Sequence, residues 1–93
     1  MEEIKKTVWV FHGANSPFSS GVFSSLAKAE EWIKRNKLCG VLTEYQLDES
    51  PYDWAISNNF FEVKRVDQST ADFIQKFTSA SQEHYHFENG EYD

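Results

Sequence analysis

The pattern of apolar and polar positions predicts three strands in the first half of the chain. Residues 8–11, Val-Trp-Val-Phe, are apolar at successive positions, which is typical of a central strand with both faces covered. A loop rich in turn-forming residues follows over 13–20, and residues 21–23 are expected to form a short strand antiparallel to the first. Apolar side chains alternate with polar ones over residues 41–47, which predicts a half-buried strand.

A helix is indicated between the second and third of these strands. Apolar side chains recur at helical spacing over residues 26–33, and the charged side chains between them face water. Ser24 or Ser25 can supply the N-cap oxygen that this helix needs. The helix is expected to stop just before Gly40, which can take the left-handed conformation of a helix end.

The second half of the chain predicts two short helices and two more strands. A serine–proline helix start at Ser50 indicates one or two turns, followed by a strand over 60–66. A second short helix is expected over 69–77 and a last strand over 82–87. The Asn89-Gly90 pair signals a hairpin turn, although too few residues follow for a returning strand. The order β-β-α-β-short α-β-α-β predicts an α+β fold, an antiparallel sheet with helices packed on one face.

The length and composition fit one small domain. We expect a single domain over 1–93, with an ordered core over about 5–88 and with aromatic residues, 16% of the chain, supplying its apolar area. Cys39 is the only cysteine, so no internal disulfide forms, and it is expected to be buried. The chain opens with charged residues, and no apolar run approaches the roughly 20 residues that span a bilayer. We therefore expect a cytoplasmic protein without a membrane partner.

The distribution of charge indicates the kind of partner. The formal net charge is −6, and nine of the fifteen acidic residues lie in two stretches, 39–62 and 78–93, that contain no Lys or Arg. Such a chain repels phosphate backbones, so we expect no nucleic-acid binding and favour a basic protein partner. The alternative is that the acidic loops only keep a small protein soluble.

Two aromatic residues in the first acidic stretch indicate a partner-binding surface. Aromatic side chains anchor protein interfaces, and carboxylates steer a basic partner toward them. The alternative for Trp54 is that it fills the core from a loop. The predicted partner-binding residues are Glu44, Asp48, Glu49, Tyr52, Asp53 and Trp54.

The three histidines are the candidates for a metal site. His84 and His86 are two residues apart on a predicted strand, so both imidazoles project to the same face, as shared coordination requires. A third ligand is expected to be His12 or Glu88. The alternative is that the pair is ordinary polar surface, because no CxxC or HExxH motif accompanies it.

No other residues form a recognisable catalytic set. Asp48, Glu49 and Asp53 lie around a turn and a helix start, where Asp53 already has a capping role. Cys39 follows a helix, whereas reactive cysteines favour helix N-termini. We therefore assign no catalytic residue, expect no cofactor, and favour a protein that is not an enzyme.

Six segments of the chain form a distinctive pattern: VWVFHG, GVF, AEEWI, LTEY, YDWAI and FTSASQEHYHFENG. This pattern spans about residues 7–90 and resembles a family of small uncharacterised bacterial proteins. The family usually has Gly at the position of Asn59, and Asn preserves the turn there. The resemblance implies a bacterial, cytoplasmic, single-domain protein, and it brings no activity and no catalytic residues.

The leading hypothesis is a non-enzymatic protein-binding module, specifically an immunity-type inhibitor that masks a basic bacterial toxin domain. This role is an analogy from size and charge. Two alternatives stay open. One is a metal-binding protein or metal-dependent enzyme that uses His84 and His86. The other is a structural subunit that self-associates through exposed aromatic residues.

Overall fold

The computed structural model describes residues 6–92. Residues 1–5 and 93, which belong to the predicted domain 1–93, lie outside the described part, and so does residue 5 of the predicted core. The elements, in chain order, are β1 (Thr7–Gly13), β2 (Ser19–Phe23), α1 (Leu26–Asn36), β3 (Gly40–Gln46), α2 (Pro51–Ser57), the 3-10 helix η1 (Val66–Ser69), α3 (Ala71–Gln75) and β4 (His84–Phe87).

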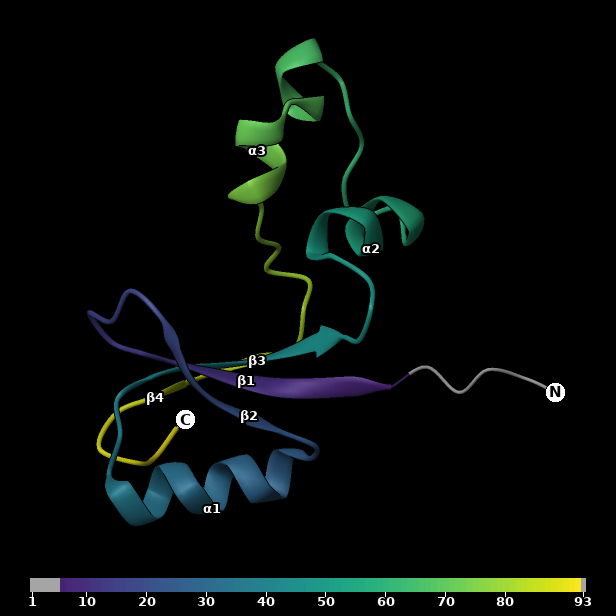
Figure 1. Ribbon diagram of the computed structural model, residues 1–93. Coiled ribbons are helices and arrows are strands. Elements are labelled where there is room, and N and C mark those ends of the chain that lie inside the picture. Colours follow the sequence, from purple (N-terminus) through teal and green to yellow (C-terminus); the bar gives the residue numbers. More distant parts are fainter. Residues whose placement is uncertain (1–5, 93) are drawn as a thin grey trace, which may run out of the picture.

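The four strands form one antiparallel sheet in the order β2-β1-β3-β4, which confirms the predicted α+β class (Figure 1). β1 is an inner strand, as predicted, and pairs with β3 along its whole length. β4 pairs with β3 although residues 47–83 separate the two in sequence. The sheet therefore brings the last strand beside the third and leaves β2 and β4 as its edges.

The main core lies between the sheet and α1, on the lower side of the sheet in Figure 1. Ile33 and Leu42 are fully buried, and Trp32 of α1 packs edge-on against Phe11 with ring centroids 5.7 Å apart. The charged side chains of α1 are exposed except that of Glu30, which is half-buried, and Glu31 pairs with Arg35 at 4.0 Å. The buried core residues are Trp9, Phe11, Ala29, Ile33, Leu42 and Phe87.

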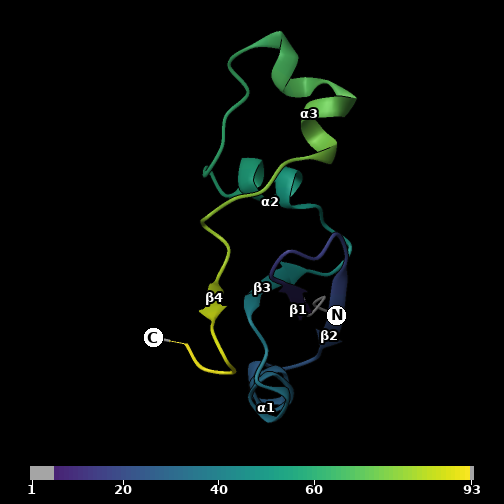
Figure 2. The same ribbon diagram turned by 90° about the vertical axis from the view of Figure 1, so that its left-hand side faces the viewer.

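A second, smaller cluster holds together what we call the helical lobe, residues 51–77, which is inserted between β3 and β4. Its elements α2, η1 and α3 lie on the side of the sheet opposite α1 (Figures 1 and 2). Tyr52 is buried at its centre, with its ring centroid 5.4 Å from that of Phe77. Phe61 and Phe73 complete the cluster. The helices are therefore divided between two sides, and only α1 contributes to the main core.

Residues 60–66, predicted as a strand, form none. Phe61 packs in the lobe cluster, but Val63, which would share its face in a strand, is 40% exposed, so no continuous buried face forms. The backbone N–H groups of Lys64 and Arg65 donate to the side chain of Gln68, at 2.8 and 3.1 Å. This local bonding leads the chain into η1 instead of into the sheet.

The predicted starts of the first two helices are confirmed, and α3 begins two residues after the predicted position 69. Ser25 caps α1 by accepting from the backbone N–H of Lys28, and Ser50 caps α2 in the same way, with the Asp53 N–H at 3.0 Å. Thr70 caps α3. In each case a side-chain oxygen satisfies a donor that has no partner within the helix.

The end of α1 differs from the prediction. Lys37, with φ of 52°, is the left-handed residue that ends the helix, and Gly40 instead begins β3. A Cβ at Gly40 would overlap the carbonyl oxygen of His12 on the neighbouring strand. Glycine is therefore needed at this position for the close approach of β1 and β3.

The alternation over 41–47 is present, and the residue buried in the main core lies on the face with fewer apolar side chains. Leu42 lies on this face, is fully buried, and belongs to the core cluster that includes residues of α1. Val41, Thr43 and Tyr45 share the opposite face and stay half-buried. Val10 of β1, opposite Thr43, is half-buried too, so this face of the sheet is covered only in part.

The predicted turn at Asn89-Gly90 is present, and a single β-bridge follows it in place of a returning strand. Asn89 and Gly90 have φ of 51° and 86°, and Glu88 and Glu91 form an isolated β-bridge across the turn. The Gly90 N–H donates to the Leu38 carbonyl at 2.8 Å and so attaches the turn to the end of α1. One bridge is enough to return the chain onto the sheet.

Candidate functional site

The predicted partner-binding residues separate into exposed and buried ones. Asp48, in the turn after β3, and Asp53, on α2, are exposed, and Glu49 is half-buried. Glu44 accepts a hydrogen bond from Thr7 at 2.7 Å and is half-buried in the sheet. The exposed carboxylates therefore surround the start of α2, and Glu44 has a structural partner.

Tyr52 is part of the lobe cluster and does not lie on the surface. Its ring is 8% exposed, and its hydroxyl donates to the Gln68 carbonyl at 2.7 Å. This bond links α2 to η1. The predicted role of Tyr52 as a surface anchor does not fit this position, because a partner cannot reach the ring.

Trp54 is neither a fully exposed anchor of a partner-binding surface nor a buried residue of the core. It is half-buried, and its ring packs on that of Phe60 with centroids 5.3 Å apart. Phe60 is 54% exposed. The two rings therefore form a partly exposed aromatic pair on the outside of the lobe.

An open cavity of about 680 Å³, which we call the lobe groove, lies beside this pair. Three of its apolar side chains, Ile56, Phe60 and Val63, are exposed. Glu62 lines the groove, and the exposed Asp53 lies about one helical turn before Ile56 on α2. The lining residues are Ile56, Asn59, Phe60, Phe61, Glu62, Val63, Lys64 and Gln68.

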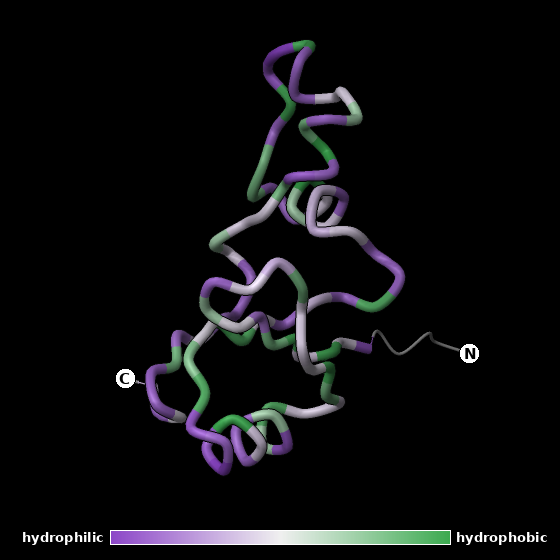
Figure 3. The backbone as a smooth tube through the Cα atoms, turned by 60° about the vertical axis from the view of Figure 1, so that its left-hand side comes forward, coloured by the Kyte–Doolittle hydropathy of each residue, from purple (hydrophilic) through white to green (hydrophobic). Residues whose placement is uncertain are grey.

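Sequence reasoning missed the groove because residues 60–66 were assigned to a strand. One signal was present. Phe60 and Phe61 are adjacent, and adjacent side chains in an extended segment point in opposite directions. The sequence therefore indicates that one of the two rings faces away from the core. Figure 3 shows the resulting mixture of hydrophobic and hydrophilic segments along the lobe.

The three histidines share one face of the sheet but do not meet. His84 and His86 lie side by side on β4, with ring centroids 5.4 Å apart. His12 pairs with Val41, and Val41 pairs with His86, so a whole strand separates His12 from the pair. Within residues 6–92, no group of three His, Cys, Asp or Glu side chains is placed to hold a metal ion. The expected third ligand is thus not brought to the pair.

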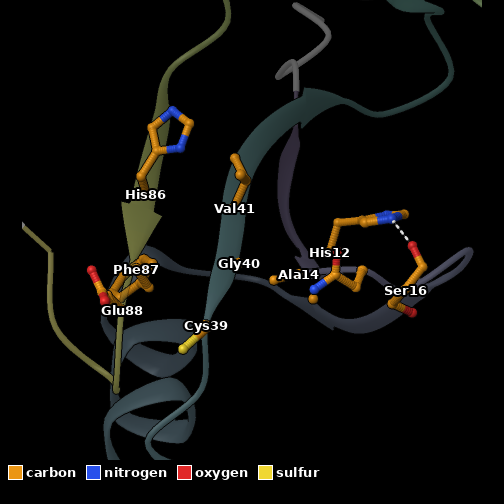
Figure 4. A pocket seen from close by; sticks show the side chains of 11 residues that line it. His12, Ala14, Ser16, Cys39, Gly40, Val41, His86, Phe87 and Glu88 are labelled. Carbon is orange, nitrogen blue, oxygen red and sulfur yellow. Dashed lines mark hydrogen bonds between the residues drawn. The ribbon is translucent and has the colours of Figure 1, made fainter.

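A second open pocket, of about 660 Å³, lies at the end of the sheet between His12 and His86 (Figure 4). The His12 Nε2 is 2.6 Å from the Ser16 carbonyl oxygen. Cys39 also lines this pocket and is exposed, which corrects the prediction that it is buried. Its sulfur accepts from the Asn89 N–H at 3.3 Å, so the thiol holds the C-terminal turn.

Shifted pKa values occur at the tip of the lobe and near the C-terminal hairpin. The hydrogen bond from Arg65 lowers the pKa of Asp67, and both side chains are exposed. The charge of Glu30 is the main cause that raises the pKa of Tyr92. Burial is the main cause that raises the pKa of Tyr85, followed by the charge of Glu83. These pairs are structural contacts at the lobe tip and at the C-terminal hairpin.

The fold and the site define a small α+β domain with an inserted helical lobe and an apolar groove flanked by carboxylates. None of the helices in residues 6–92 is long and apolar enough to cross a membrane. Residues 8–93 match the model of a family described as a domain of unknown function, DUF7710, and the chain belongs to that family. No curated protein and no solved structure matches the chain.

Proposed function

We propose that this domain is a non-enzymatic protein-binding module, and that the lobe groove with its flanking carboxylates binds a basic protein. The observation that carries the proposal is the exposure of Ile56, Phe60 and Val63 around one cavity that Glu62 also lines. Exposed apolar surface that gathers around a cavity and is bordered by polar residues is characteristic of interaction sites.

The charge of the region supports a basic partner. No Lys or Arg occurs over residues 39–62, and the five acidic residues of that stretch include the exposed Asp48 and Asp53. Carboxylates at the rim raise the rate at which a basic partner arrives, and the apolar groove receives its anchor side chain. Lys64 is the one basic residue among the lining residues of the groove, and Glu62 is the one acidic residue.

The class of partner that we infer is a bacterial toxin domain with a basic surface, which the module masks in the cytoplasm as an immunity-type inhibitor. Size, net charge of −6 and the lack of a disulfide in a chain with one cysteine support this role. The lobe fits such a role because its anchors sit on short elements held by an aromatic cluster, away from the main core.

The test uses two variants with the same change in charge. Asp53→Lys/Glu62→Lys alters the groove, and Glu31→Lys/Glu91→Lys alters exposed acids on α1 and the C-terminal turn. The native partner is first captured at low salt, identified by mass spectrometry and purified. Its dissociation constant is then measured by calorimetry at low and high salt for the unmodified domain and both variants.

We expect the groove variant to weaken binding at least tenfold and to reduce its dependence on salt, while the control variant keeps both. Phe60→Ala should also weaken binding, whereas Val66→Ala, at a residue 87% exposed outside the groove, should not. Thermal unfolding of each variant verifies that it is folded. Equal affinity of the groove and control variants would overturn the assignment of this surface.

A further inference from the structure

The ring of His84, one of the histidine pair on β4, is oriented by a hydrogen bond to the backbone. The Nδ1 of His84 lies 2.7 Å from the carbonyl oxygen of Gln82. A carbonyl oxygen only accepts, so Nδ1 carries the proton and the neutral ring presents the lone pair of Nε2 to solvent. A hydrogen bond from the second ring nitrogen to a backbone carbonyl is the usual support of a histidine that binds a metal.

The spacing of the two rings is close to that of two imidazoles that share an ion. Their centroids are 5.4 Å apart and their planes are at 81°. Two imidazoles bound to one tetrahedral ion, with each nitrogen about 2.0–2.1 Å from it, have centroids about 5 Å apart. Both rings are on exposed residues, so rotation about their side-chain bonds can turn the nitrogens toward a common ion.

The pair is also accessible. His84 and His86 are exposed on an edge strand, and their neighbours on β3 are Thr43 and Val41, which offer no charge that would compete for the imidazoles. The net charge of −6 favours the approach of a cation. No third ligand from residues 6–92 joins the pair, so the remaining coordination positions stay open.

We propose that His84 and His86 form an open, two-imidazole site for a divalent transition-metal ion, whose remaining positions are filled by water or by a second chain. Imidazole ligands suit Zn²⁺, Ni²⁺ and Cu²⁺, and the affinity is expected to be highest for Cu²⁺. Mg²⁺ prefers oxygen ligands and is not expected to bind. The site does not depend on the lobe groove.

The experiment uses the full chain without a histidine tag. Zn²⁺ is titrated into the protein at constant pH, the imidazole resonances of the three histidines are followed by NMR, and the ratio of ion to chain is obtained by calorimetry. The variants are His84→Ala and His86→Ala, with His12→Ala as the control, because His12 lies on the same face but one strand beyond. Thermal unfolding shows whether each variant is folded.

We expect Zn²⁺ to shift the resonances of His84 and His86 together, and either alanine variant to weaken binding at least tenfold, with His12→Ala unchanged. A ratio of one ion to two chains with the same dependence on the pair also supports the site, because two pairs complete a tetrahedron. The proposal is overturned if Zn²⁺ shifts neither resonance, if His12→Ala weakens binding as much as the pair variants, or if Mg²⁺ gives the same shifts.

Discussion

The ring of Tyr92 packs on the ring of Tyr85, with centroids 4.8 Å apart, and so closes the C-terminal hairpin over the outer strand of the sheet. Tyr92 also packs on Phe87, a member of the main core, at 5.0 Å. The turn between them is attached to α1 through the Gly90 N–H. The last residues described therefore contribute to the stability of the domain.

Replacement of Gly90 by alanine should destabilise the domain by about 1–3 kcal/mol, because its φ of 86° is strained for any residue with a Cβ. The added Cβ would also lie 3.0 Å from the Lys34 Cα, which is backbone and cannot yield easily. The measurement is the free energy of unfolding in urea. Gly13→Ala is the matched control, since its Cβ would meet other atoms only at 3.8 Å or more. A loss at Gly13 as large as that at Gly90 would contradict this account.

The free energy of unfolding should fall as the pH rises above 10, because the pKa of Tyr92 is raised from its ordinary value of 10.0, mainly by the charge of Glu30. A raised pKa keeps the folded chain protonated where the unfolded chain has lost its proton, so the contribution is complete below pH 10 and is lost as the pH passes the folded pKa. Urea unfolding between pH 9 and about 12 measures this loss.

Two variants isolate the source of this pH dependence. Tyr92→Phe should make the alkaline loss smaller, and Glu30→Gln should lower the pKa of Tyr92 in an ultraviolet titration. Glu31→Gln, on the same helix but paired with Arg35, is the control and should leave the titration of Tyr92 unchanged. An unaltered tyrosine titration in Glu30→Gln would show that the charge of Glu30 is not the cause.

Tyr52→Ala should open the helical lobe without unfolding the sheet. The substitution removes the central ring of the lobe cluster, with an expected local cost of about 3–5 kcal/mol by comparison with other aromatic truncations. Tyr52→Phe keeps the ring and loses only the bond to Gln68, which should cost about 0.5–1.5 kcal/mol. Amide hydrogen exchange should become faster within residues 51–77 only.

Leu42→Ala is the contrasting variant for this test. Leu42 is fully buried beneath α1, so its truncation should cost about 2–5 kcal/mol and accelerate exchange throughout the sheet. If Tyr52→Ala accelerates exchange in β1 and β3 as much as in the lobe, the lobe and the sheet unfold as one unit. The two clusters would then not be separate units of stability.

The fold class and the helix starts could be predicted because their signals are local. Ser25, Ser50 and Thr70 cap the helices through oxygens only three residues from their donors. The buried face of β3 could not be predicted from the residues of β3 alone. Leu42 has fewer apolar neighbours on its face than Val41 does, but it meets α1, and only the packing of α1 decides that.

The candidate site was predicted in part for the same reason. The acidic stretch around Asp53 is visible in the sequence, whereas the exposure of Phe60 depends on the side chain of Gln68 holding residues 64 and 65 out of the sheet. The alignment of His84 and His86 follows from strand periodicity alone. The distance of His12 from the pair depends on strand order, which periodicity does not contain.

The insertion of the lobe between two neighbouring strands has a consequence for folding kinetics. β1 and β2 are close in sequence and can pair early, whereas Gly40 and Phe87 meet only after a long stretch of chain, lobe included, has been closed into a loop. The entropy of closing a loop grows only slowly with its length, so such an insertion is tolerated at equilibrium. It makes the docking of β4 a late and slow event, and the domain acquires its complete sheet only when its C-terminal end is in place.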